Sequence, residues 1–268
     1  MKIATWNINS VRLRIELVKQ FLRDEAPDAL CLQETKCNDD QFPRKAFIDA
    51  GYEHLAIKGQ PGYNGVAIVS RLPLKLINTR QFCGKDDARH VCAQLPGGVE
   101  LHNFYVPAGG DEPDRKKNEK FDHKLKFVTE MRDWFTELAS PRKKRVLVGD
   151  LNIAPHENDV WSHKQLLKVV SHTPIEVDHL AQLIDAGKWI DVARALHEND
   201  EKLYSWWSYR ARDWKTSNRG RRLDHIWVSP ALRKAALSEG ANAFKIHDYA
   251  RGWERPSDHA PVSLSLAL

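Results

Sequence analysis

Several apolar segments of this sequence run directly into acidic, amide or imidazole side chains. Polar residues follow segments 2–6, 29–33 and 145–149 directly, and polar residues also come directly before segment 260–266. The polar residues at these ends are Asn7, Glu34, Asp150, Asn152, Asp258 and His259. Carboxylates and amides are costly to bury beside strands unless they are paired or bind a metal ion. We therefore predict that these ends meet at one edge of the fold and form one polar, metal-binding site.

Glu34 and Asn7 have the chemistry of a magnesium site. If 2–6 and 29–33 are neighbouring strands, the carboxylate of Glu34 lies across from the amide of Asn7. Mg²⁺ prefers oxygen ligands and keeps several of its waters, so a carboxylate, an amide and several waters make such a site. The cysteines and histidines show no zinc-binding spacing, and we interpret the scattered histidines as surface or paired polar residues.

The motif Gly149-Asp150-Leu151-Asn152 combines an acid with an amide. We expect the glycine to permit a sharp turn, and extended backbone to point Asp150 and Asn152 to the same side. Such a pair can handle a proton and stabilise developing negative charge. The alternative is an Asx turn that only ends the strand.

Asp224 and His259 are candidates for a carboxylate–histidine pair. Alternation places residues 222, 224 and 226 on one face of a strand. A carboxylate on an imidazole fixes its tautomer and raises its basicity. Asp258, next to His259, is a candidate contact to a metal or a metal-bound water. Tyr105 ends segment 101–105, where its hydroxyl can reach a phosphate, although a tyrosine in a strand more often serves packing.

The composition is that of a globular enzyme, because 42% of the 268 residues are hydrophobic and 29% are charged. We expect one domain over 1–268. No apolar run approaches the length of a membrane span and the N-terminus lacks an apolar signal segment, so we expect a cytoplasmic protein without membrane contact. Cys31 and Cys92 lie in apolar segments, which predicts buried free thiols in a reducing compartment.

The net charge of +5 is matched by one segment, 210–222. Its basic residues are Arg210, Arg212, Lys215, Arg219, Arg221 and Arg222, against the single acid Asp213. Basic residues interleaved with tryptophans suit a nucleic-acid backbone; the alternative is a solvated loop with core tryptophans.

We interpret the basic run 142–145 as the solvated start of the strand whose far end carries Asp150. The lysines of 116–126 stay undecided between a substrate edge and a solvated face.

Apolar periodicity predicts a mixed, partly antiparallel α/β fold. The expected strands are 2–6, 29–33, 52–57, 65–70, 74–82, 90–95, 99–106, 145–149, 203–208, 222–228 and 260–266. The expected helices include 11–24, 42–50, 118–138 and 177–187. Hairpin-length turns such as 62–65 and 96–98 argue against a purely parallel barrel.

Taken in order, these segments resemble the exonuclease III type of apurinic/apyrimidinic endonuclease, within the endonuclease/exonuclease/phosphatase superfamily. The motifs that carry the resemblance are Trp6-Asn7-Ile8-Asn9, Leu32-Gln33-Glu34-Thr35-Lys36, Gly62-Tyr63-Asn64-Gly65-Val66, Tyr105-Val106-Pro107, Gly149-Asp150-Leu151-Asn152-Ile153-Ala154-Pro155, Arg222-Leu223-Asp224 and Ser257-Asp258-His259-Ala260-Pro261. The resemblance implies a four-layered α/β sandwich, with two mixed, mainly antiparallel sheets packed face to face and flanked by helices. It also implies Mg²⁺- or Mn²⁺-dependent hydrolysis of double-stranded DNA 5′ to abasic sites, together with 3′→5′ exonuclease and 3′-end-trimming activity. We expect the enzyme to act as a monomer.

The resemblance assigns roles to individual residues. The implied metal-site residues are Asn7, Glu34, Asp150, Asn152 and Asp258, with Glu34 as the principal ligand, and the implied catalytic residues are Tyr105, Asp150, Asn152, Asp224 and His259. Asp150 orients or deprotonates the attacking water, Asn152 stabilises the transition state and Tyr105 contacts the scissile phosphate. His259, held by Asp224, is the partner acid or base, or a phosphate contact. Which of Asp150 and His259 accepts the proton stays open: an ordinary histidine pKa of about 6.5 suits a base at neutral pH, but the family pattern favours Asp150.

The sequence departs from the family pattern at two positions. Where the family often has an amide after Tyr-x-Pro, this chain has Ala108, so one phosphate contact is missing or comes from the backbone of Gly109-Gly110. The pocket for the flipped sugar is usually lined by apolar or aromatic residues, and the matching residues here are Trp206, Arg221 and Leu223. We expect Arg221 to weaken apolar packing on the sugar and to add a phosphate contact.

Two other interpretations compete with a DNA-repair nuclease. A phosphatase or phosphodiesterase of the same fold that acts on a small or lipid phosphate is disfavoured by the basic, tryptophan-containing segment 206–222. A non-catalytic DNA-binding relative is disfavoured because all the candidate site residues are present.

Overall fold

The computed structural model describes residues 1–211 and 213–268. Two six-stranded sheets form its centre. In spatial order, the first contains β13 (Phe244–Ile246), β14 (Val262–Ser265), β1 (Lys2–Asn7), β2 (Ala29–Gln33), β4 (Val66–Ser70) and β3 (His54–Lys58). The second contains β5 (Lys75–Asn78), β6 (His90–Leu95), β7 (Val99–Tyr105), β8 (Arg145–Asp150), β12 (Asp224–Val228) and β9 (Ile190–Asp191). A separate hairpin pairs β10 (Trp206–Trp207) with β11 (Gly220–Arg221).

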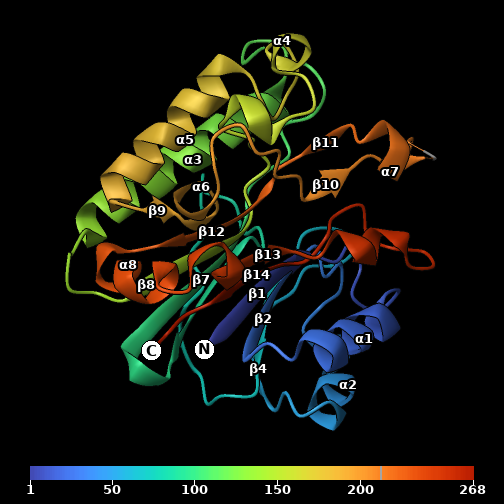
Figure 1. The fold of residues 1–268 in the computed structure, drawn as a ribbon, viewed down its shortest axis with the longest axis vertical. Helices are drawn as coiled ribbons and strands as arrows, with labels where there is room; N and C mark the ends of the chain where they lie inside the picture. Colours follow the sequence, from blue (N-terminus) through green and yellow to red (C-terminus); the bar gives the residue numbers. More distant parts are fainter. Residues whose placement is uncertain (212) are drawn as a thin grey trace.

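Helices cover the outer face of each sheet (Figure 1). The α-helices are α1 (Ile15–Glu25), α2 (Arg44–Asp49), α3 (Glu119–Leu138), α4 (His163–Leu166), α5 (Pro174–Gly187), α6 (Val192–Leu196), α7 (Trp214–Ser217) and α8 (Arg233–Leu237). Short 3₁₀ turns occur at Pro96–Gly98, Glu157–Asp159, Pro230–Leu232, Gly240–Ala243 and Asp248–Gly252. Helices α1 and α2 pack on the first sheet, and α3 and α5 pack on the second. The predicted four-layered sandwich is confirmed. None of the helices in the described ranges combines the length and the apolar composition that a membrane crossing requires.

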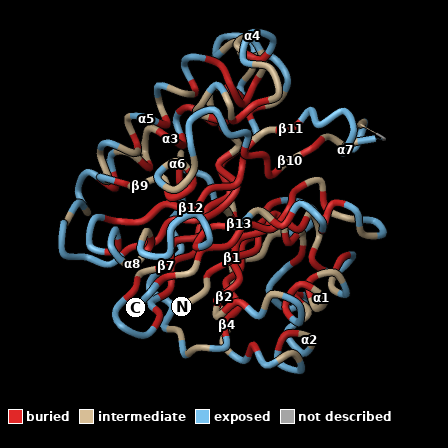
Figure 2. The backbone as a smooth tube through the Cα atoms, in the orientation of Figure 1, coloured by how far each residue is buried: buried red, intermediate tan, exposed pale blue. Residues whose placement is uncertain are grey.

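The largest apolar core lies between the two sheets. Inward-facing residues such as Ile3, Val148 and Ile226 form it, and each is fully buried. In Figure 2 the central strands are therefore almost continuously buried, while the exposed residues lie mainly in the outer loops and on the outer helix faces. The four cysteines are free, and Cys31 and Cys92 are buried as predicted.

Strand direction explains why the polar strand ends meet. Each sheet has one parallel pair at its centre, β1–β2 in the first and β7–β8 in the second, and its other pairs are antiparallel. The carboxyl ends of the parallel strands share an edge, and the antiparallel strands β12 and β14 begin at that same edge. The amide of Asn7 at the end of β1 donates to Asp150 Oδ2 at the end of β8, at 2.9 Å. The edges of both sheets therefore form one site.

A buried amide also links the two sheets. Asn103 on β7 donates from Nδ2 to the carbonyls of Leu32 and Ala67 in the first sheet, at 3.0 and 2.9 Å. Its Oδ1 accepts from Gln33 Nε2 at 2.6 Å. A buried polar group left without such partners costs about 1–3 kcal/mol, so these bonds favour one alignment of the sheets.

Several predicted element boundaries shift. Helix α1 begins at Ile15 rather than at residue 11, because Arg14 has the non-helical angles φ −117° and ψ 22°. Helix α5 begins at Pro174, three residues early, because Thr173 and Glu176 form a capping box. The predicted strand 203–208 is reduced to β10, and strand 222–228 begins only at Asp224. Elements β9, β11, β13, α4, α6, α7 and α8 were not predicted; each has five residues or fewer.

The basic run at 142–145 lies at the opposite end of β8 from Asp150, as predicted. Arg145, however, is buried rather than solvated. Its Nε donates to Glu100 Oε2 and its Nη1 donates to the carbonyl of Leu138, both at 2.7 Å. The expectation of a solvated strand start is wrong for this residue, because a carboxylate on the neighbouring strand β7 pairs with the guanidinium.

Gly149 does not make the predicted sharp turn, since β8 continues through Asp150. Its φ is +139°, and a Cβ at this position would lie 1.9 Å from the carbonyl oxygen of Phe104 on β7. Glycine is therefore required here by the close approach of two central strands and by a backbone conformation that other residues rarely adopt.

We expect Gly149→Ala to lower the free energy of unfolding by about 3–5 kcal/mol, because the backbone strain and the clash with β7 add together. Gly98→Ala is the matched control: Gly98 also has a positive φ, +74°, but no atom lies within 4 Å of its added Cβ. The control should lose only about 1–2 kcal/mol. Urea denaturation measures both. Equal losses would show that the contact with β7 is unimportant.

Candidate active site

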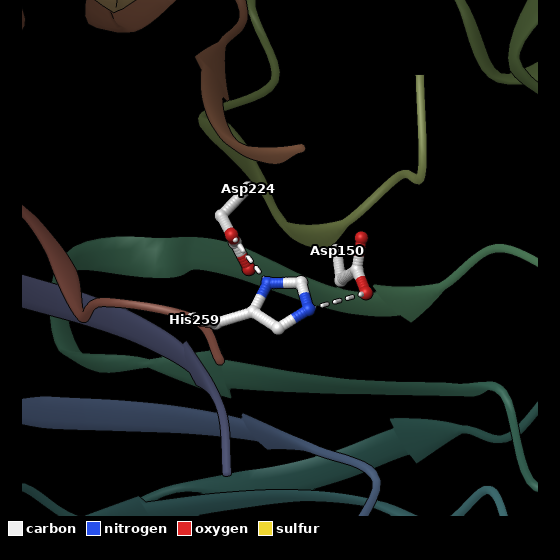
Figure 3. Close-up of side chains that lie close together, drawn as sticks. All are labelled: Asp150, Asp224 and His259. Carbon is white, nitrogen blue, oxygen red and sulfur yellow. Dashed lines mark hydrogen bonds and ion pairs between the residues drawn. The ribbon is translucent and has the colours of Figure 1, made fainter. Parts of the chain in front are cut away.

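One imidazole lies between two buried carboxylates at the shared sheet edge (Figure 3). Nδ1 of His259 donates to Oδ2 of Asp224 at 2.8 Å, and its Nε2 lies 3.6 Å from Oδ2 of Asp150. Asp150 and Asp224 are partners in the register of β8 and β12, so both reach the same ring. The predicted histidine–carboxylate pair is present, and Asp150 joins it on the other side.

Burial and charge set the protonation of this cluster. Burial raises the pKa of the Asp150 carboxyl; the charge of His259 opposes this rise and that of Asp224 adds to it. Burial alone would lower the pKa of His259, but the carboxylates of Asp224 and Asp150 raise it well above its ordinary value. At neutral pH the imidazole therefore carries a proton, and Asp150 holds a proton more readily than an exposed aspartate.

Ser205 orients Asp224, although no motif marked it in the sequence. Its Oγ donates to Asp224 Oδ2 at 2.7 Å and accepts from the backbone N–H groups of Leu223 and Asp224 at 3.1 and 3.0 Å. The alternation expected over 222–226 fails at its start. The backbone N–H of Arg222 donates to Asp159 rather than to β8, so the Arg222 side chain lies against His225 and not beside Asp224.

Asn152 lies beside Asp150, as predicted. Its backbone N–H donates to Asp150 Oδ1 at 2.9 Å, and its Nδ2 donates to Asp150 Oδ2 at 3.2 Å and to the Val106 carbonyl at 2.9 Å. The backbone is not extended here, because Asn152 has a φ of 54°. The left-handed backbone conformation of Asn152 turns its side-chain amide toward the Asp150 carboxylate. Asparagine tolerates this conformation well.

Glu34 forms a second carboxylate centre next to the first. Its Oε1 accepts from Asn7 Nδ2 at 3.0 Å and from the Tyr105 hydroxyl at 2.8 Å, and its Oε2 pairs with Lys36 Nζ at 2.7 Å. Burial alone would raise the pKa of Glu34, but these three partners lower it below its ordinary value. Asn7 donates to both Glu34 and Asp150, so the two carboxylates lie on either side of one amide.

Asp258 points to the same edge and is held on both oxygens. Its Oδ2 accepts from the indole N–H of Trp206 at 3.0 Å, and its Oδ1 accepts from Asn9 Nδ2 at 3.2 Å. Burial opposes the charge, but His259 and these two donors lower the pKa of Asp258. Asn9, which the sequence placed only within a motif, also accepts from Lys36 at 2.6 Å and so links Asp258 to Glu34.

The donor set fits a divalent cation that prefers oxygen ligands. The lowered pKa of Glu34 keeps its carboxylate ionised, as a metal ligand requires, and the Lys36 ammonium occupies one of its two oxygens. Among the described residues, ligand atoms of Asp150, Asp224 and His259 also lie within 4.8 Å of one another. In that group the bond between His259 and Asp224 already occupies one ring nitrogen. The Asn7 amide turns its N–H toward Glu34 and its oxygen toward the Asn9 N–H, so the Glu34 carboxylate itself is the oxygen ligand that could hold a divalent cation.

A cavity of about 730 Å³ opens over both carboxylate centres. Trp206, Arg221 and Leu223, the predicted sugar-pocket residues, all line it. The Arg221 guanidinium lies 5.1 Å from the centroid of the Trp206 ring and donates from Nη1 to the Val170 carbonyl and to Ser171 Oγ, at 3.1 and 2.8 Å. Its buried Nε has no partner in the described part of the chain. One wall of the cavity is thus cationic.

The basic segment 210–222 divides between the cavity and the core. Arg210 and Arg219 line the cavity, together with Arg221. Arg222 does not: it is buried in ion pairs with Asp159 and Asp191, at 2.8 and 2.7 Å, so the expectation that it contacts a nucleic acid is wrong. Trp214 packs against the buried Trp207. Arg212 lies outside the described residues.

An α/β sandwich whose two sheets share one edge of buried acid, amide and imidazole groups has the organisation of a phosphoester hydrolase. Residues 4–259 match the model of the Endonuclease/Exonuclease/phosphatase family, and the chain belongs to this family. Its similarity to exonuclease III-type enzymes extends over the full length, which confirms the resemblance inferred from the motifs.

Two curated relatives cover nearly the whole chain. Exodeoxyribonuclease III of Haemophilus influenzae is 31% identical, with 98% of each chain covered. DNA repair nuclease APEX1 of Danio rerio is also 31% identical, with all of this chain and 83% of the relative covered. Among solved structures, an AP endonuclease from Archaeoglobus fulgidus superposes with a TM-score of 0.91 at 30% identity, with all of both chains covered. The 3′-5′ exonuclease NExo from Neisseria meningitidis gives 0.87 at 33% identity, again with all of both chains covered.

The raised pKa of His259 gives a direct test of the site electrostatics. Because its raised pKa favours the proton, we expect NMR titration to find the imidazole still protonated as the pH rises through 7, with the proton lost only in alkaline solution. In Asp224→Asn the largest charge that raises this pKa is removed, so deprotonation should shift to lower pH. An unchanged titration in Asp224→Asn would contradict the assigned pairing.

Proposed function

We propose that this chain is a metal-dependent DNA-repair nuclease that hydrolyses phosphodiester bonds 5′ to abasic sites and trims 3′ ends of duplex DNA. The observation that carries the proposal is the buried Asp150 carboxyl, which lies against a protonated imidazole and two amides below an arginine-lined cavity. A related 3′ phosphatase, NExo, at 32% identity and a TM-score of 0.85, was solved with a product DNA hairpin. The proposal includes action as a monomer in the cytoplasm.

Asp150 is the better candidate for the general base. Its raised pKa lets it accept a proton from water near neutral pH, whereas the His259 imidazole is already protonated there and cannot accept another proton. The imidazolium instead supports binding of a phosphate oxygen or donation of a proton to the leaving group. Asn152, whose amide is hydrogen-bonded to Asp150, is the candidate for stabilising the negative charge that develops on the phosphate.

The remaining groups hold the substrate. Tyr105 keeps its proton, because burial and the charges of Glu34 and Asp150 raise the pKa of its hydroxyl, so it can donate to a phosphate oxygen. A Mg²⁺ or Mn²⁺ ion held by Glu34, with Asn7 and Asp258 nearby, would neutralise phosphate charge during the reaction. Arg221 presents a fixed cation beside Trp206 and Leu223, which supports a phosphate contact next to the sugar.

Two duplexes test the proposal, one with an internal abasic site and one with a recessed 3′ end. We expect incision 5′ to the abasic site and removal of 3′ nucleotides in Mg²⁺, and loss of both in EDTA. Glu34→Gln keeps the shape of the side chain but removes its charge, so it should lower kcat and weaken the response to Mg²⁺. The absence of EDTA-sensitive cleavage of either duplex would overturn the proposal.

The pH dependence of kcat/KM separates the two candidate bases. Because Asp150 must be ionised to accept a proton, the rate should rise as the pH increases through its elevated pKa. We expect Asp150→Asn to lower kcat/KM by at least about 10³-fold and to remove this acidic limb. His259→Asn should also slow the reaction but keep the limb. If only the His259 variant loses the acidic limb, Asp150 is not the base.

A further inference from the structure

Lys124 in α3 differs from the other lysines of 116–126, which are all at least partly exposed, because it is fully buried. Its ammonium points under the candidate active site. Nζ donates to the carbonyl of Asn152 at 2.7 Å, to the carbonyl of Ala108 at 3.2 Å and to the carboxylate of Glu176. An ammonium has three donors, and all three are used. The lysine therefore has one defined position.

Glu176 fixes the ammonium from the opposite side. This carboxylate is also fully buried and is part of the capping box that begins α5. It accepts from the Ser171 N–H at 2.9 Å, from the Thr173 N–H at 3.1 Å and from the Thr173 hydroxyl at 2.6 Å. These bonds restrain both carboxylate oxygens, so Glu176 cannot easily follow a displacement of Lys124.

The two carbonyls that Lys124 holds belong to the two loops that form the site. Asn152 lies two residues after Asp150, and Ala108 directly follows Tyr105-Val106-Pro107. Asn152 has a left-handed φ of 54°, so the orientation of its carbonyl and of its side chain are linked through one unusual backbone conformation. The lysine stem also packs closely on the second loop, since a Cβ on Gly109 would lie 2.9 Å from Lys124 Cδ.

We propose that Lys124 is a positioning residue for phosphodiester hydrolysis. By holding the Asn152 carbonyl against the Ala108 loop, it sets the direction in which the Asn152 amide faces the Asp150 carboxylate and the reacting phosphate. It does not touch the substrate. This proposal rests on the proposed function, in which Asn152 stabilises the transition state, and it makes Lys124 act on the rate through Asn152.

The test compares Lys124→Met, Asn152→Ala and the double variant on the abasic-site duplex in Mg²⁺. We expect Lys124→Met to lower kcat by about 10²-fold, the size of effect that a misplaced catalytic group produces. The Kd for the same duplex, measured in EDTA, should stay within about threefold of wild type. In the Asn152→Ala background, Lys124→Met should lower kcat by less than about threefold, because the Asn152 side chain through which Lys124 acts is already absent.

Two further variants separate positioning from stability. Arg145→Met is the matched control: it removes a buried cation that also binds a carbonyl and a carboxylate, but at the opposite end of β8. It should lower the thermal midpoint and leave kcat unchanged. Lys124→Arg keeps the positive charge beside Glu176 and moves the donors, so it remains informative where Lys124→Met does not fold. It should show a smaller loss of kcat, which also disappears in the Asn152→Ala background.

Either of two results would overturn the proposal: a folded Lys124 variant with a kcat within about threefold of wild type, or equal losses in the two backgrounds. A failure of the proposed function looks different, because wild-type protein would then cleave neither the abasic-site duplex nor the recessed 3′ end. In that case Lys124 has no reaction to position, and this inference fails with it.

Discussion

Two carboxylates, those of Asp150 and Asp224, lie opposite each other on antiparallel strands and share one imidazole. Burying two like charges so close together is unfavourable unless a positive charge lies between them. His259 supplies that charge, and Ser205 and Asn7 donate hydrogen bonds to the same two carboxylate oxygens that face the imidazole. The raised pKa values of Asp150 and His259 both follow from this arrangement. The rest of the site is built around keeping these three groups in place.

The site belongs to neither sheet alone. Asp150 and Asp224 come from the second sheet, whereas Asn7, Glu34 and His259 come from ends of the first. Any shift of one sheet over the other would separate the Asn7 amide from Asp150 and leave buried polar atoms unpaired. The inter-sheet bonds of Asn103 oppose the same shift from within the core. The bonds that align the two sheets therefore also fix the geometry of the site.

The parts of the site that the sequence predicted are those where a polar residue ends a buried strand. Asn7, Glu34, Asp150 and Asp258 were found in this way, because burial makes such residues conspicuous against apolar neighbours. Ser205 and Lys124 were missed. Ser205 lies in no motif. Lys124 lies three residues after Phe121 and four before Val128, so helical spacing placed it on the buried face of α3, but its partner Glu176 is 52 residues away. The capping box that contains Glu176 was visible as Thr173-Pro174-Ile175-Glu176, but its link to α3 requires the fold.

The loop after Asp150 shows how the fold restrains a candidate catalytic residue, Asn152, through its backbone. Three successive carbonyls accept bonds from buried side chains: Asn152 from Lys124 at 2.7 Å, Ile153 from His225 at 2.8 Å and Ala154 from His172 at 2.6 Å. Buried carbonyls need partners in any fold, and in most loops water supplies them. Here long side chains from a helix, a strand and a neighbouring loop supply them instead. The Asn152 amide and the Asp150 carboxylate are thus held before substrate arrives, so binding need not order them.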